Sequence, residues 1–367
     1  MFKRFLSYYE PQMGLFVADT VCALVLAAID LAFPIILRNL TGGLFTQGQA
    51  AIMQALGMIA VGLVLMYAVR CACRYFVSYW GHVMGARMES KMREDLFDQY
   101  ERFSFAYFDR NSSGDMMSRV VNDLFDICEA AHHVPEWIII CGIEIIGSFV
   151  ILFTIAPVLA LAMAVVTAAF AVVMFWQNMR MREVFSDNRK KISGINAQLQ
   201  DSLAGMRVVK SFANEETERA KFRASNDRYL LSKENMYHAM GVYTATYGLL
   251  SGVLYVIVVL LGGWLVAQGQ LQAVDMATFA LYISLFCTPL ETLVNSAETY
   301  QKAIAGFKRM DEVLSTAPDI QDKPGATDLQ VTAGAVEYHD VCFNYEDVEL
   351  GEGYACLLYT SDAADEL

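Results

Sequence analysis

Three carboxylates stand inside apolar stretches of the sequence, where a charged side chain is costly: Asp30, Glu144 and Glu291. In such surroundings a carboxylate either pairs with a base or contacts a cationic or amphipathic molecule. Glu144 is the sharpest case, because isoleucines flank it on both sides. For Glu144 two alternatives stay open beside ligand contact. It could pair with His132 or with an arginine at the inner edge of its stretch, or the apolar stretch could end elsewhere.

Aromatic residues recur at helical spacing near the last two apolar stretches. Tyr243, Tyr247 and Tyr255 keep near one helix face, and Tyr282 with Phe286 continues the theme. Aromatic faces suit a permissive binding pocket, although each residue is also an ordinary helix-packing side chain. The residues expected to line a ligand cavity are Glu144, Tyr243, Tyr247, Tyr282, Phe286, Glu291 and Asn295.

Metal and catalytic chemistry have weaker support in the sequence. His132 and His133, with Glu136 nearby, are interpreted as an interfacial cluster, and Cys71 and Cys73 lack further ligands at zinc-type spacing. We therefore expect no metal site. The 367 residues also contain no Gly-x-x-x-x-Gly-Lys-Ser/Thr loop, so no catalytic residue for ATP hydrolysis is assigned.

Composition indicates which elements must position these groups. The chain is 56% hydrophobic and 18% charged, against about half and a quarter in ordinary soluble domains, which argues against a water-soluble enzyme. A bilayer core of about 30 Å needs about 20 apolar residues in a helix. Six such stretches predict an all-α membrane protein, with spans near residues 15–37, from 52 into the 70s, and near 137–155, 157–176, 243–267 and 276–294.

Charge distribution predicts the orientation of these spans. Twelve Lys and Arg residues lie between residues 180 and 233, whereas the segments 39–51, 155–157 and 268–275 contain none. Loops that stay in the cytoplasm carry an excess of Lys and Arg residues. Both termini are therefore expected to be cytoplasmic, in a multi-pass protein of the plasma or inner membrane. Segments 80–135 and 177–240 are too long for simple turns, and their apolar residues recur at helical spacing, which predicts span helices that continue into the cytoplasm.

Three motifs in these cytoplasmic segments resemble those of ATP-binding cassette exporters. The first runs from Tyr107-Phe108-Asp109 through Gly114-Asp115 and Ser118-Arg119 to Asn122-Asp123. The second is the run Asp201-Ser-Leu-Ala-Gly-Met-Arg-Val-Val-Lys-Ser-Phe212. The third is Ala303-Ile-Ala-Gly-Phe-Lys-Arg-Met-Asp-Glu-Val-Leu314, which departs mildly from the family pattern at Gly306 and Phe307.

The resemblance implies a type I exporter transmembrane domain of six helices with long cytoplasmic extensions. It implies short coupling helices near residues 112–117 and 213–219 that rest on nucleotide-binding domains. The residues it assigns to this contact are Ser112, Ser113, Gly114, Asp115, Met116, Ala213, Asn214, Glu215 and Glu216. The implied partners are a second exporter half, in a homodimer or heterodimer, and the lipid bilayer. Nucleic acid is not an implied partner.

The C-terminal piece is acidic, with fourteen acids and one base after Met310 in a chain of net charge −13. Residues 334–345 alternate like a strand and resemble the start of a nucleotide-binding domain, in which Tyr345 would stack on the adenine of ATP. We therefore expect a transmembrane domain at 1–317, a linker at 318–333, a truncated β fragment at 334–355 and an artefactual tail at 356–367. ATP and Mg²⁺ are expected in the full-length protein, and this chain is not expected to bind either fully.

The function that this resemblance implies is ATP-driven export of hydrophobic or amphipathic compounds, such as a drug, lipid or peptide, by alternating access. A channel-like or regulatory subunit that does not pump is the alternative. An integral membrane enzyme is disfavoured, because neither clustered metal ligands nor a nucleophile with its base is visible in the sequence.

Overall fold

Helices account for the fold that the computed structural model describes, which covers residues 2–327 and 334. The strand expected at 334–355, including Tyr345, and the tail at 356–367 lie outside these residues, apart from Gly334. Contacts divide the chain into one unit of Met1–Ile320, which holds every helix described here, and a second unit of Gln321–Leu367. The helices are α1 (Phe2–Ser7), α2 (Met13–Gly42), α3 (Gln49–Phe76), α4 (His82–Glu101), α5 (Phe105–Arg110), α6 (Ser113–Ser118), α7 (Leu124–Ile155), α8 (Pro157–Ala204), α9 (Met206–Ser211), α10 (Glu215–Ile257), α11 (Gly263–Ala267) and α12 (Ala273–Ser315).

Six helical segments of the described chain are long and apolar enough to cross a membrane, which confirms the predicted number of spans. Several are longer than one bilayer requires, because helices such as α8 and α10 continue past their apolar stretches into charged sequence. The long connections are therefore helical extensions, as predicted. The chain is a multi-pass membrane protein.

The hairpin predicted near residue 155 is also present. Ala156 adopts an extended conformation between α7 and α8, and Pro157 occupies the first turn of α8. Proline fits there because its missing N–H would have no helical partner in that position. Three π-helical turns, η3 (Val77–Gly81), η4 (Arg119–Asp123) and η5 (Val258–Gly262), interrupt the otherwise regular helices.

Two hydrophobic clusters hold the helices together. The first joins α7, α8, α10 and α12 around Phe170, Phe279, Tyr282 and Phe286. The second lies where α1, α4, α7 and the end of α12 meet, and Met84, Met88, Met92, Leu96 and Tyr100 line it from α4 at every fourth residue. Because residues four apart lie on one helix face, this stripe fixes which side of α4 faces α7 and α12.

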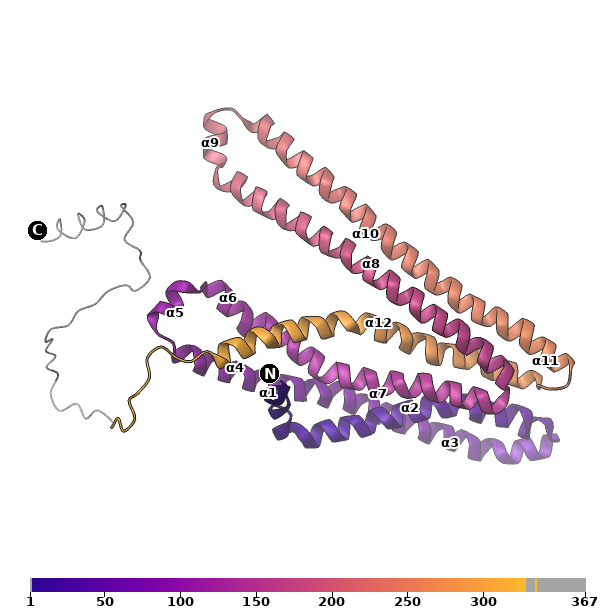
Figure 1. Ribbon diagram of the computed structural model, residues 1–367. Coiled ribbons are helices and arrows are strands. Elements are labelled where there is room, and N and C mark those ends of the chain that lie inside the picture. The colour runs from indigo at the N-terminus through magenta and orange to yellow at the C-terminus, as the bar shows by residue number, and fades with distance from the viewer. Residues whose placement is uncertain (1, 328–333, 335–367) are drawn as a thin grey trace, which may run out of the picture. The chain divides into compact units, whose positions relative to one another are not determined.

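Figure 1 shows where the extensions lead. The helices α8 and α10 run beside each other toward α9, and α4 and α7 lead to the short helices α5 and α6. We call this the loop end of the helices. The opposite end carries the turns around α11 and between α2 and α3.

Candidate functional site

The first loop at the loop end is built from the short helices α5 and α6, of which α6 has a side-chain cap. Ser112 is the N-cap of α6, and its Oγ accepts a hydrogen bond of 3.2 Å from the backbone N–H of Gly114. Asp115 lies in the first turn, where a carboxylate interacts favourably with the helix dipole. The Asn111 amide donates to the carbonyl oxygen of Tyr107 at 2.8 Å. The predicted short helix near 112–117 is therefore present, one residue displaced.

An ion pair joins this loop to the last helix. Arg309 on α12 donates two hydrogen bonds to Asp123 in η4, from Nε to Oδ2 at 2.7 Å and from Nη2 to Oδ1 at 2.6 Å. Such bidentate geometry is stronger and more directional than a single contact. The two residues come from the first and third sequence motifs, so the pair links those motifs in space.

Gly306 explains the departure of the third motif from its family pattern. A Cβ at this position would lie 3.2 Å from the carbonyl oxygen of Asp123 and 3.3 Å from its Cβ. The absence of a side chain lets α12 approach η4 closely. Next to it, Phe307 is buried and packs edge-to-face on Phe5, with ring centroids 5.2 Å apart.

The second loop differs from the prediction. The short helix is α9, Met206–Ser211, and not the segment 213–219. Ala213 and Asn214 form the turn, with Ala213 at a φ of +50°, and Glu215 and Glu216 begin α10. The physical reason lies in charge, because acidic residues in a first turn stabilise a helix N-terminus and so extend α10 back to residue 215.

Contacts between α8 and α10 support this second loop. Ser202 on α8 donates a 2.9 Å hydrogen bond to Glu218 on α10, which also pairs with Lys221 at 2.6 Å. Both loops expose apolar side chains at their tips, since Phe105 is 90% exposed and Phe212 is 79% exposed. Each is a single exposed aromatic side chain at the end of a helical extension.

The aromatic base of the first loop is, by contrast, packed. Tyr107 stacks on Phe103 with ring centroids 4.0 Å apart, and Phe103 is buried. Burial raises the pKa of Tyr107 above its usual value, while the positive charge of Arg119 partly opposes the rise. The phenol therefore stays protonated at neutral pH and anchors the loop by packing.

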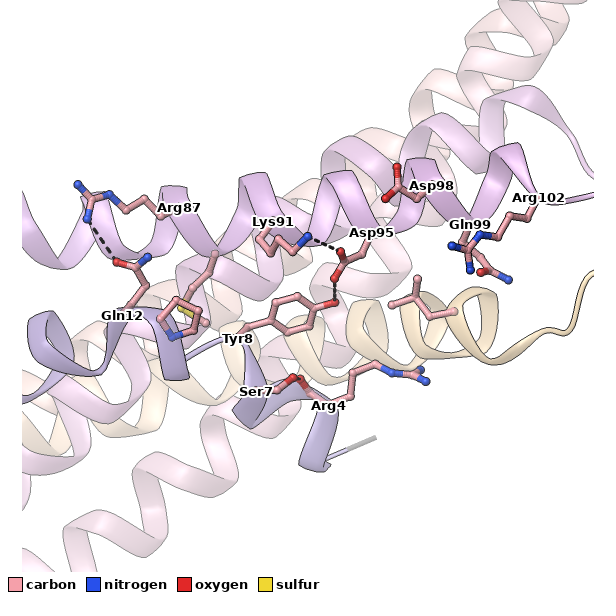
Figure 2. A pocket seen from close by; sticks show the side chains of 13 residues that line it. Arg4, Ser7, Tyr8, Gln12, Arg87, Lys91, Asp95, Asp98, Gln99 and Arg102 are labelled. Atoms are coloured by element: carbon pink, nitrogen blue, oxygen red, sulfur yellow. Dashed lines mark hydrogen bonds and ion pairs between the residues drawn. The ribbon is translucent and has the colours of Figure 1, made fainter. Parts of the chain in front are cut away.

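The N-terminal segment is fastened to the loop end by polar contacts around a pocket (Figure 2). Tyr8 donates a 2.7 Å hydrogen bond to Asp95 on α4, and Lys91 pairs with the same carboxylate at 2.9 Å. Arg4 pairs with Asp311 on α12 at 2.5 Å. These contacts place α1 and the residue after it, Tyr8, against α12 and α4, so the position of the N-terminal segment depends on how those two helices are arranged.

Asp30, one of the three intramembrane carboxylates, has a partner in the structure. Arg70 on α3 donates to it from Nε at 2.8 Å and from Nη2 at 3.2 Å. Sequence reasoning missed Arg70, although an arginine inside an apolar stretch was the available signal. Glu144 is buried within the electrostatic range of Asp30, Arg70 and Arg74, and the described chain shows no hydrogen bond or ion pair to its carboxylate.

The aromatic residues expected around a cavity fall into two groups. Tyr282 and Phe286 are fully buried, with the Tyr282 hydroxyl donating to the Leu31 carbonyl oxygen at 2.6 Å and Phe286 lying 4.9 Å from Phe149 between ring centroids. In this structure they are packing residues of the core. The reason is that α12 lies against α2 and α7, a neighbourhood that spacing along α12 does not reveal.

The other group lies between α10 and α12 and is more accessible. Tyr243 is buried, and its hydroxyl is 3.4 Å from the amide oxygen of Asn295, which is exposed. Tyr247 and Glu291 are half-buried and line a small hollow together with Phe170. The structure brings Tyr243, Tyr247, Glu291 and Asn295 together, while Glu144 lies on α7 near α2 and α3.

These observations define a class: a multi-pass membrane protein whose span helices continue into two helical loops, the first of which is capped by Ser112 and joined to the last helix by an ion pair. The chain belongs to the family of the ABC transporter transmembrane region, whose profile matches residues 16–290. Because that match covers most of the chain, it confirms the family that the three motifs indicated.

Similar proteins include the uncharacterized ABC transporter ATP-binding protein YwjA of Bacillus subtilis, at 32% identity over 95% of this chain and 60% of that protein. The ATP-dependent lipid A-core flippase of Syntrophus aciditrophicus is 24% identical over 95% of this chain and 57% of its own length. A flippase of the same name from Shewanella sp. strain MR-4 is also 24% identical, over 95% and 60%. The chain spans about 60% of the length of these relatives.

The described residues do not form a site that fits ATP and Mg²⁺. No helix N-terminus there carries the Gly-rich phosphate-binding loop with its lysine, and Tyr345 lies outside the described residues.

Proposed function

We propose that this chain is the membrane-spanning half of an ATP-driven exporter of hydrophobic or amphipathic compounds, which works with a second half in a dimer. The observation that carries the proposal is the ion pair between Asp123 and Arg309, which connects the first loop to α12 through two short hydrogen bonds. A displacement of the loop is passed to a span helix because the bidentate pair resists rotation.

In this proposal α6 and the turn from α9 to α10 contact the nucleotide-binding domain. The contact residues are those assigned by resemblance, Ser112 to Met116 and Ala213 to Glu216. The location of these residues supports the assignment, because both sets lie at the loop end beside exposed apolar side chains. Nucleotide binding would move the two loops together and the helices with them, in an alternating-access cycle in which both termini face the cytoplasm.

The ligand contacts that we propose are Tyr243, Tyr247, Glu291 and Asn295, which lie together between α10 and α12, and Glu144, which lies apart from them on α7. A carboxylate beside aromatic groups favours cationic amphiphiles, because the rings bury the apolar part and the carboxylate binds the charge. Tyr282 and Phe286 support these residues by packing. The names of two relatives, lipid A-core flippases, agree with an amphipathic ligand.

The test uses this chain joined to a complete nucleotide-binding domain and reconstituted in liposomes. We expect ATP-dependent accumulation of a cationic amphipathic dye, and ATPase activity that the dye stimulates. Dye movement or ion conduction that persists without ATP would support the channel-like alternative and overturn the exporter proposal.

The loop contacts are tested in the same protein by disulfide cross-linking. A cysteine that replaces Asp115 or Glu216 should cross-link to cysteines on the nucleotide-binding domain. The matched control is Thr154→Cys, which is exposed near the opposite end of α7 and should not cross-link. Equal cross-linking at all three positions, or none at Asp115 and Glu216, would contradict the proposed contact.

A further inference from the structure

Three of the five histidines of the chain meet at the loop-end side of α7. His132 and His133 are adjacent on α7, and His82 is the first residue of α4. The ring centroid of His82 lies 4.5 Å from that of His132 and 5.1 Å from that of His133, and the centroids of His132 and His133 are 4.0 Å apart. Glu129 lies one helical turn before His133, with 3.6 Å between its Oε2 and Nε2 of His133.

The four side chains converge closely enough for one ion. Each offers one ligand atom, and these atoms all lie within 4.8 Å of one another. A tetrahedral ion with bonds of about 2.0–2.1 Å needs ligand atoms about 3.3 Å apart. Side-chain rotations that shift each ligand atom by about 1 Å would therefore close the site. Three imidazoles and one carboxylate form a donor set that suits Zn²⁺ and similar divalent transition metals.

His132 is arranged as metal-binding histidines are. Its Nδ1 lies 2.9 Å from the carbonyl oxygen of Cys128, and because a carbonyl only accepts, Nδ1 carries the proton. The lone pair is then on Nε2, which is buried and has no hydrogen-bond partner in the described chain, in a residue that is only 4% exposed. An unsatisfied buried nitrogen is costly, and a metal ion would satisfy it.

The surrounding backbone makes room for this ring. A Cβ on Gly85 would lie 3.1 Å from Nδ1 of His132, and one on Gly81 would lie 3.8 Å from Cδ2 of the same ring. The π-helical turn η3 ends at Gly81, directly before His82, and such turns occur often at functional sites.

Carboxylates around the cluster add the negative charge that a divalent cation requires. Glu136 lies 3.7 Å from Nδ1 of His133, on the side of the ring away from Glu129, as an outer carboxylate does beside a metal-bound histidine. Asp19 contributes a buried oxygen without a hydrogen-bond partner in the described residues. His82 is exposed, which leaves a path for an ion to enter.

We propose that His82, Glu129, His132 and His133 bind one divalent transition-metal ion of the Zn²⁺ type, which fastens α4 to α7. The sequence alone led to the opposite expectation, because His82 is about fifty residues from the other ligands. The ion would hold the two helices that lead into the first loop at a fixed separation.

The test uses the chain purified without a polyhistidine tag, freed of metal with a chelator and titrated with Co²⁺. We expect one Co²⁺ per chain with the strong visible absorption of tetrahedral coordination, and displacement of Co²⁺ by Zn²⁺. His82→Gln and His132→Gln should each weaken binding at least tenfold. His238→Gln is the matched control, an exposed histidine on α10 that should leave binding unchanged.

A second measurement covers the case in which His132→Gln fails to fold. Zn²⁺ should raise the thermal unfolding midpoint of the wild-type chain and of His238→Gln, but not that of His82→Gln, whose exposed position spares the core. The proposal is overturned if Co²⁺ shows only a weak octahedral spectrum, or if His82→Gln binds and responds to metal as the wild type does. Neither result bears on the exporter proposal.

Discussion

At the scale of single residues, polar side chains connect helices that are far apart in the sequence. Asp123 and Arg309, Asp30 and Arg70, and the histidine cluster each join two helices. In each case at least one member is buried or half-buried, so loss of its partner leaves a polar group without compensation. Such losses cost more than the net value of the contact itself.

The ion pair between Asp123 and Arg309 gives the first prediction. Arg309→Ala should lower the free energy of unfolding by about 1–3 kcal/mol, because Asp123 is buried and would lose both hydrogen bonds. Thermal unfolding in detergent measures the change. Lys308→Ala, at the exposed neighbouring position, should stay within about 0.5 kcal/mol of the wild type. Equal effects of the two substitutions would show that the pair contributes no stability.

Gly306 gives the second prediction, which concerns close packing. Gly306→Val should destabilise the protein by about 1–3 kcal/mol, because its side chain would collide with the backbone of Asp123. Gly194→Val on α8 is the comparison, since no atom lies within 4 Å of a Cβ there, and it should change stability by no more than about 0.5 kcal/mol. Urea unfolding followed by circular dichroism distinguishes the two, and a stable Gly306→Val protein would contradict the close approach of α12.

At the scale of elements, the short helix α6 and the turn before α10 each depend on a single local residue. A six-residue helix such as α6 has few internal hydrogen bonds, so its cap contributes a large share of its stability. The turn before α10 depends in the same way on one residue in a left-handed conformation.

The cap of α6 can be removed without touching the core. Ser112→Ala should destabilise α6 by about 0.5–2 kcal/mol, because the N–H of Gly114 loses its acceptor. Hydrogen exchange of the amides of residues 113–118 should speed up, while Ser113→Ala leaves those rates nearly unchanged. Unaltered exchange in Ser112→Ala would mean that the cap does not hold this helix.

A substitution at Ala213 is expected to stabilise the protein, whereas the substitutions above destabilise it. Its φ of +50° is unfavourable for any residue with a Cβ, so Ala213→Gly should stabilise the turn by about 0.5–1 kcal/mol. Ala220→Gly, within α10, should instead destabilise the helix by about 1 kcal/mol. Hydrogen exchange of the amides at the start of α10 measures both stability changes. A loss of protection in Ala213→Gly would be evidence against the strained turn.

At the scale of the whole molecule, the alternation of short and long connections defines two ends. The short turns carry no basic residue between positions 39 and 51, whereas the extension of α8 and α10 carries twelve Lys and Arg residues from position 180 to 233. Basic residues are retained on the cytoplasmic side, so the loop end should face the cytoplasm.

Cysteine labelling in intact cells tests this orientation. In a background without native cysteines, Gln47→Cys should react with an impermeant maleimide from outside, and Asn214→Cys should react only after the cells are opened. Both positions are exposed, so reactivity reports sidedness and not burial. The reverse pattern would place the loop end outside and refute the proposed orientation.

The sequence predicted what depends on local composition. The length of an apolar stretch determines whether a helix can cross a bilayer, so six spans and the turn at Ala156 followed from residues read one after another. The first short helix was located by the family resemblance of the motif around Gly114 and Asp115, and its cap at Ser112 is a local contact. The second short helix was misplaced, because residues 213–219 instead form the turn and the first residues of α10, whose acidic first turn extends that helix back to residue 215.

The tertiary structure decided what depends on which helices are neighbours. Periodicity places Tyr282 on one face of α12 but does not say that α2 covers this face, and spacing does not show that His82 meets His132 and His133. The partners of Asp30 and Asp123, likewise, come from helices 40 and 186 residues away. Apolar patterns along a helix specify burial but not the burying neighbour, and so the membrane spans were determined by the sequence alone while the polar contacts between them were determined by packing.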